Sequence, residues 1–154
     1  MRLILPMFAF LLLAAPASAA EKVRVQTRAP FEKSTAALVD AIQKNKMGLV
    51  TRANAQAGAA SRGVKIRGNQ VIGVFRPDFA IRMLKASVDA GFEAPIRIYI
   101  YENEDGTATI AYVKPSDVFA PYAKPDLDKM AKELDAIFAR IVQDALAAAR
   151  KPAP

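Results

Sequence analysis

Residues 96–113, IRIYIYENEDGTATIAYV, are the most informative stretch of the chain. Isoleucines alternate there with Arg97, Tyr99 and Tyr101, and this period of two is typical of a β-strand with one buried face. The acidic segment 102–106 ends in glycine and suits a turn, and residues 107–113 then return as a second strand. The stretch predicts an antiparallel hairpin with isoleucine on one face and arginine and tyrosine on the other.

Periodicity and turn residues predict the other elements. Strands are expected at 22–28, 49–52 and 71–75, and helices at 30–46, 77–91 and from about 126 onward, with a brief helix in the Ala/Gly-rich stretch after residue 52. Gly48 is expected to cap the first main helix. The second carries an apolar stripe, and the last should bury Met130 with its helical neighbours. That stripe consists of Phe79, Ile81, Leu84 and Val88.

This order of elements predicts an α+β fold. A hairpin followed by a lone C-terminal helix does not make a regular series of parallel βαβ units. We expect a two-layer sandwich, in which helices cover one face of a mostly antiparallel sheet of about five strands.

The first twenty residues, MRLILPMFAFLLLAAPASAA, have the pattern of a secretory signal peptide. Arg2 precedes an apolar run, and small residues follow at the expected cleavage site near Ala19 or Ala20. A permanent anchor is the alternative, but a spanning helix needs about 20 apolar residues and this run is shorter. We expect a periplasmic protein without a transmembrane segment after cleavage, with one domain over 21–149 and a disordered tail over 150–154.

The chain contains neither cysteine nor histidine. This excludes disulfides, thiol catalysis, the Ser-His-Asp arrangement and the common zinc sites. The acidic segment 102–106 lacks the spacing of a calcium loop and is interpreted as a turn. We therefore expect no metal and no cofactor, and chemistry limited to carboxylates, lysine, tyrosine and backbone groups.

Positive charge is concentrated in the middle of the chain. The formal net charge is +7, and the segment 52–85 holds one acid, Asp78, among many cations. Such a surface suits a small anion, an anionic lipid or an acidic partner. Nucleic acid is not expected, because no basic motif interleaved with aromatic residues is present. The cations are Arg52, Arg62, Lys65, Arg67, Arg76, Arg82 and Lys85.

Several motifs also resemble a known family. FEKSTAALVDAIQKNKMGLV, QAGAA, VIGVFRP, APIRIYIYENEDG and AYVKP, in this order over residues 31–122, look like the family known as domain of unknown function 302, in its form with a signal peptide. The resemblance implies a two-layer α+β fold of the TATA-box-binding-protein-like class and often a dimer, but no established activity. The family commonly has a small residue and asparagine before the proline that matches Pro77, where this chain has Phe75 and Arg76.

Two surfaces are candidate binding sites. At the start of the second main helix, Arg76 and Asp78 flank Pro77, and free backbone N–H groups there could hold an anion with Arg62 as a second clamp. Alternatively, Asp78 simply caps that helix.

The second surface is the sheet face without helices. Arg97, Tyr99, Tyr101 and Tyr112 are expected to form an aromatic patch there for a flat ligand or a second subunit. Alternatively, these tyrosines only fill the edges of the sheet.

The leading hypothesis is a non-catalytic envelope protein that binds a small anionic or amphipathic ligand or a partner. The first alternative is a homodimeric interaction module that uses the Arg/Tyr face. The second is an enzyme, for example with Glu102 and Tyr112 as an acid/base pair.

Overall fold

The computed structural model describes residues 21–151. The expected signal peptide lies outside these residues, and so do residues 152–154 of the expected tail. The last helix includes Arg150, so the chain is still helical where the tail was expected to begin. Within the described residues, no helix has both the length and the apolar character needed to cross a membrane.

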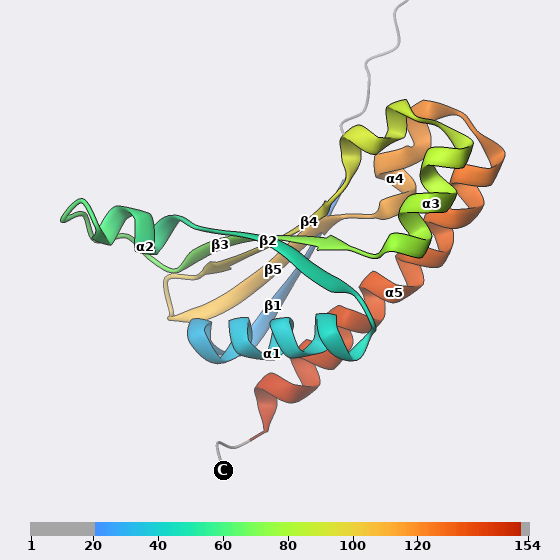
Figure 1. Cartoon of the computed structure of the whole chain (residues 1–154). Coiled ribbons are helices and arrows are strands. Elements are labelled where there is room, and N and C mark those ends of the chain that lie inside the picture. Colours follow the sequence, from blue (N-terminus) through green and yellow to red (C-terminus); the bar gives the residue numbers. More distant parts are fainter. Residues whose placement is uncertain (1–20, 152–154) are drawn as a thin grey trace, which may run out of the picture.

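One five-stranded sheet organises the chain (Figure 1). The strand order is β1-β5-β4-β3-β2, and every neighbouring pair is antiparallel. The expected hairpin is the β4–β5 pair, so the period-two pattern of its isoleucines is confirmed. The strands are β1 (Lys22–Pro30), β2 (Gly48–Asn54), β3 (Asn69–Phe75), β4 (Ile96–Glu102) and β5 (Thr107–Val113).

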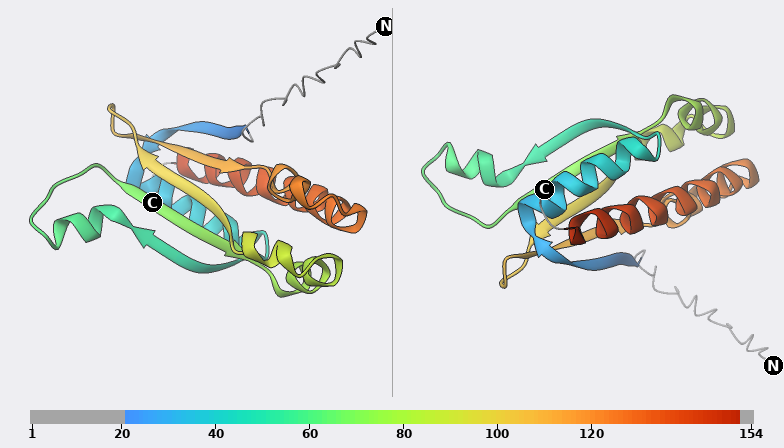
Figure 2. Two further views of the ribbon diagram at one scale, coloured as in Figure 1. Left: turned by 90° about the horizontal axis from the view of Figure 1, so that it is seen from above. Right: turned by 90° about the horizontal axis from the view of Figure 1, so that it is seen from below.

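Helices form the second layer. Figure 2 shows α1 and α5 side by side across one face of the sheet, while none of the described helices covers the opposite face. α2 extends beyond one end of the sheet, and α3 and α4 lie at the other end (Figure 1). The helices are α1 (Phe31–Lys44), α2 (Ala55–Ala60), α3 (Pro77–Ala86), α4 (Pro115–Phe119) and α5 (Pro125–Arg150), with 3₁₀ turns η1 (Asp89–Glu93) and η2 (Ala120–Tyr122).

The hydrophobic core lies between the two layers. Ile96, Ile98 and Ile100 of β4 are buried against the helices, and Leu134 and Phe138 of α5 are buried from the other side. Each β4 isoleucine faces the core because alternate residues of a strand point to the same side. The expected two-layer α+β sandwich is confirmed.

The end of α1 differs from the expectation. Gly48 is the first residue of β2, and the left-handed residue is Lys46, with φ 58°. Asn45 is the C-cap, and its side chain donates hydrogen bonds to the Ala41 carbonyl and to Asp144 of α5. These bonds fix the turn one residue after the cap, so glycine is not needed there.

The second main helix ends at Ala86, earlier than the expected end at Gly91, and Phe79 is the one buried member of its expected apolar stripe. Ile81 and Leu84 are 65% and 46% exposed, and Val88 lies beyond the end of α3 and is 76% exposed. Phe79 and Met83, four residues apart, are the buried side chains of α3. α3 begins just after the end of β3 and packs against α5, so only the face that carries these two residues meets the core.

Candidate functional site

The uncovered face of the sheet carries polar and aromatic side chains on its central strand. Arg97, Tyr99 and Tyr101 alternate with the buried isoleucines of β4 and therefore point away from the helices. Arg97 is exposed, and both tyrosines are partly exposed. Small residues flank them on β5, since Ala111 lies opposite Tyr99 and Thr109 lies opposite Tyr101. The neighbouring side chains on β5 are thus shorter than the tyrosine side chains.

The two tyrosines form an ordered aromatic pair. Their ring centroids are 5.2 Å apart and the ring planes differ by 29°, which is a stacked arrangement. The Tyr99 hydroxyl accepts a hydrogen bond of 2.6 Å from the Asn69 side chain on β3. Because stacking and this bond both restrain Tyr99, the face presents a prearranged aromatic surface.

A groove of about 780 Å³ runs over this face. Val71, Tyr99 and Ala111 lie along its floor, and η1 contributes Phe92 to its side. Phe92 is 89% exposed, the highest value among the large apolar residues of the described chain. Lys22 of β1 and Arg97 of β4 also line the groove. The groove therefore combines apolar walls with cationic groups.

The backbone of Gly73 shapes one end of the groove. A side chain at this position would collide with the Thr51 hydroxyl and would come within 2.9 Å of Cγ of Pro95. Thr51 and Pro95 both line the groove. A glycine is needed here because β2 and the segment before β4 approach the β3 backbone closely.

The cations of the groove have no partner charges in the part of the chain that is described. Lys22 and Arg97 form no ion pair within residues 21–151. Glu93 is the one acidic lining residue, and its carboxylate accepts a 3.1 Å hydrogen bond from the Tyr122 hydroxyl. Three cationic residues line the groove and outnumber it: Lys22, Arg52 and Arg97. The groove is thus suited to receive a negatively charged group.

Comparison with known protein families shows which family this chain belongs to. The family described as Domain of unknown function DUF302 matches residues 22–145. The chain belongs to the DUF302 family. The resemblance inferred from the motifs is confirmed, while the form with a signal peptide stays a prediction.

A solved structure of the family has the same fold. The crystal structure of an uncharacterised conserved DUF302 protein from Bacillus stearothermophilus is similar, with a TM-score of 0.69 and 17% identity. The similarity covers 84% of this chain and 98% of that one. At this identity the likeness supports the fold alone. A search among curated proteins found no significant match.

Tyr112 of this DUF302 chain is among the residues that line the groove, but its side chain points toward the core, so its expected place in the aromatic patch of the uncovered face was wrong. It lies opposite Ile98, and directly opposite residues of an antiparallel pair point to the same side. Its side chain is 8% exposed, and its ring lies 5.6 Å from that of Phe138. Burial, helped by the charge of Asp135, raises the pKa of the Tyr112 hydroxyl.

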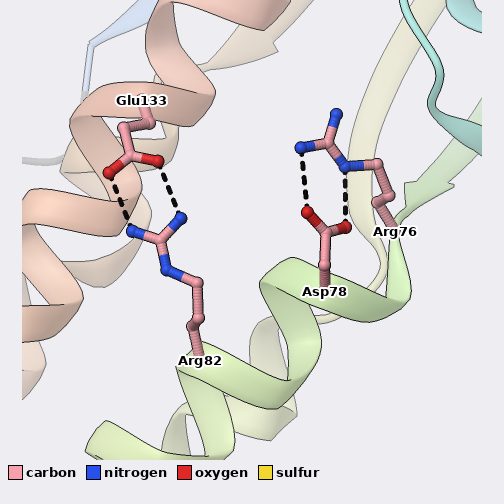
Figure 3. Close-up of polar contacts among 4 residues, drawn as sticks. All are labelled: Arg76, Asp78, Arg82 and Glu133. Atoms are coloured by element: carbon pink, nitrogen blue, oxygen red, sulfur yellow. Dashed lines mark hydrogen bonds and ion pairs between the residues drawn. The ribbon is translucent and has the colours of Figure 1, made fainter.

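Arg76, expected to hold an anion at the start of α3, is already paired with the carboxylate of Asp78 (Figure 3). The Arg76 guanidinium donates two hydrogen bonds, of 2.7 and 3.0 Å, to the Asp78 carboxylate. This pairing lowers the pKa of Asp78. Arg76 also lies over the Phe79 ring, 4.3 Å from its centroid. Arg76 is therefore engaged by groups of its own helix.

Arg62 is too far from Arg76 to act with it. Arg62 follows α2, near the start of β3, and donates to the Gly58 carbonyl at 3.1 Å. Arg76 follows the end of β3. A strand rises about 3.3 Å per residue, so about 20 Å of strand separates the two ends. The structure does not bring the two arginines together.

The Glu102 and Tyr112 acid/base pair is not formed either. Glu102 lies opposite Ala108 and accepts a 2.7 Å hydrogen bond from the Gly68 amide, which ties the loop before β3 to β4. Tyr112 lies level with Ile98, four residues along β4 from Glu102. That spacing is about 13 Å along a strand, too long for proton transfer between the two side chains.

Sequence reasoning missed Phe92 and Lys22 as groove residues. Phe92 lies in a 3₁₀ turn that the helical pattern of residues 77–91 did not predict. Lys22 reaches the groove because β1 pairs with β5, where Lys22 lies opposite Val113. The place of Lys22 depends on the strand order, and that of Phe92 depends on the 3₁₀ turn between α3 and β4, so neither has a local sequence signal.

Proposed function

We propose that this DUF302 chain is a non-catalytic binding module whose uncovered sheet face holds a small amphipathic anion. The observation that carries the proposal is the groove of about 780 Å³, which has Tyr99 on its floor, Phe92 at its side and Arg97 among its lining residues. Ligand pockets are typically 300–1,000 Å³ in volume, mostly apolar, with a few placed polar groups. The groove meets each of these conditions.

The groove favours a ligand with a flat ring and one anionic group. A ring packed against Tyr99 gains aromatic contact, and Phe92 would cover part of it from the side. A carboxylate at Arg97 could form the paired hydrogen bonds that a guanidinium makes well. Lys22 adds a second positive charge. The ligand would thus be held by apolar contact and oriented by charge.

An NMR titration tests this proposal. The probe is 1-naphthoate, and 1-naphthalenemethanol has the same rings without the charge. We expect amide shifts centred on residues 97–101, with naphthoate binding more tightly than the alcohol. Arg97→Gln should weaken naphthoate binding about tenfold, because one charge-assisted contact is lost, and should leave the alcohol unaffected.

Arg140→Gln is the matched control, because it removes the same charge from an exposed position on α5. It should leave naphthoate binding unchanged. If millimolar naphthoate shifts no amide of β4, or if both arginine variants weaken it equally, the groove is not an anion site.

We further propose that the chain works outside the cytoplasm. The support is the pattern of the first twenty residues, with Arg2, an apolar run and small residues near Ala19. Mass spectrometry of the protein from a periplasmic fraction should give a chain that starts at Ala20 or Glu21. An intact chain recovered only from the cytosol would contradict export.

Self-association is the second candidate function. Phe92 and Val88 are 89% and 76% exposed beside the groove, and two copies related by a two-fold axis could exchange such side chains. A dimeric mass in light scattering that Tyr99→Asp converts to a monomeric one would favour this function. A dimer unaffected by Tyr99→Asp would place the contact elsewhere.

A further inference from the structure

All the methionines of the described chain meet at one place. The sequence has five, of which Met1 and Met7 precede the described residues. The other three, Met47, Met83 and Met130, line one cavity of about 30 Å³. They come from the turn between α1 and β2, from α3 and from α5. Segments far apart in the sequence thus bring three thioethers to one cavity.

This cavity is poorly suited to water. Val74, Ile96 and Leu134 are among the apolar residues that line it, and Arg76 is its one charged lining residue. A buried water needs two to four polar partners, and such a lining offers few. Its volume of about 30 Å³ exceeds the roughly 10–15 Å³ that one water-sized sphere needs. The space is therefore large enough for one small ion.

The donor set selects the kind of ion. Thioethers are soft, neutral ligands that favour Cu(I) over hard divalent cations. Because the chain lacks cysteine and histidine, methionine provides its only soft side-chain donors. Each methionine has three rotatable side-chain bonds, so its sulfur can turn toward an ion with little change of the backbone.

We propose that Met47, Met83 and Met130 form a three-thioether site for a soft monovalent cation, Cu(I) or its redox-inert analogue Ag(I). The site lies on the core side of the sheet, under α3. Ala94 and Ile96 line both this cavity and the groove, but Arg97 and Tyr99 of the uncovered face line only the groove.

Nearby charges do not oppose such an ion. The guanidinium groups of Arg76 and Arg82 lie 4.3 and 5.3 Å from the centroid of the Phe79 ring, which lines the cavity. Each is neutralised by a carboxylate (Figure 3): Arg76 pairs with Asp78, and Arg82 bonds Glu133 of α5 through 2.7 and 2.8 Å contacts. A cation in the cavity thus faces two neutral pairs.

α3 forms one wall of the cavity. It contributes Met83 and Phe79 to the cavity, while its opposite side is exposed to solvent. The bidentate Arg82–Glu133 pair ties it to α5 at the surface. The cavity is already partly open to the surface, so an ion can reach it without a movement of the sheet.

Metal titration of the protein tests the site. Native mass spectrometry with Ag(I), and anaerobic competition for Cu(I) against a coloured Cu(I) chelator, should both give one bound ion per chain. Met83→Leu, Met47→Leu and Met130→Leu should each weaken binding by at least about tenfold. Exchange of methionine for leucine conserves volume and usually costs less than about 1.5 kcal/mol, so the variants should fold.

Leu38→Met is the matched control, because it adds a thioether at a buried position that does not line the cavity. Its Ag(I) affinity should equal that of the parent. X-ray absorption of the Ag(I) complex should show sulfur neighbours only.

Three results would overturn the site: no specific one-to-one complex, single methionine variants with parental affinity, or nitrogen and oxygen neighbours around silver. The methionines would then serve only to fill an irregular part of the core. Arg97→Gln should leave Ag(I) affinity unchanged, so this test is independent of the anion groove.

Discussion

α5 and α3 both carry apolar stripes, but only one of these stripes is buried. In α5, Leu134, Phe138 and Ile141 pack into the core across the face of the sheet. In α3, Ile81 and Leu84 face solvent, although their spacing also suits a helix. The comparison shows that helical periodicity predicts an amphipathic helix, whereas the position of the helix relative to the sheet decides which of its apolar residues are covered.

The largest expected effect is at the centre of α5. Phe138 is fully buried and its ring lies 5.6 Å from that of Tyr112. Phe138→Ala should lower the free energy of unfolding by about 3–5 kcal/mol, because it leaves a cavity in the core. Urea unfolding followed by circular dichroism measures this change. A loss below about 1 kcal/mol would mean that α5 does not hold the centre of the core.

A smaller and more local effect is expected in α3. Phe79→Ala removes one of the two buried side chains of this helix and should cost about 3 kcal/mol, the low end for a buried phenylalanine. Because α3 lies at the end of the sheet, its amides should exchange hydrogen faster while those of β4 stay protected. Equal acceleration in both elements would show that α3 and the sheet unfold together.

As the pH falls, α3 should lose stability before the core of the sheet does. Hydrogen bonds from Arg82 and Arg76 lower the pKa values of Glu133 and Asp78 below their ordinary values of 4.5 and 3.8. Carboxyl groups with a lowered pKa stabilise the folded state above those ordinary values, and this stability is lost as pH falls through the folded-state pKa. Amide exchange in α3 should therefore rise relative to β4 below about pH 4.

Arg82→Gln tests this explanation. It should make α3 amides exchange faster at neutral pH and leave a weaker response to acid, because Glu133 then loses the hydrogen bond that does most to lower its pKa. An unchanged acid response would show that other groups control it.

The smallest effect is expected on the exposed stripe of α3. Ile81→Gln and Leu84→Gln should each change the free energy of unfolding by no more than about 0.5 kcal/mol, because surface side chains contribute little. Chemical denaturation measures this at low protein concentration. A larger loss that appears only at high concentration would show that a second copy covers the stripe.

The sequence predicted the sheet better than the groove. Strict alternation of isoleucine in β4 identified the hairpin and both of its faces. The predicted sheet face of Tyr112 was wrong. This face depends on the register across the turn, which places Ile98 opposite Tyr112. Lys22 reaches the groove from the first strand, far from β4 in the sequence, and Phe92 reaches it from a 3₁₀ turn just before β4. Local patterns describe one strand at a time, whereas the groove is made by strand order and register.

The strand order also constrains how the chain can fold. β1, the first strand, pairs with β5, and Lys22 lies opposite Val113, 91 residues later (113 − 22). The entropy of closing so long a loop must be overcome before this pair is stabilised, and such non-local pairing slows folding. During synthesis, the first strand to be made must therefore wait unpaired until nearly the whole sheet is available.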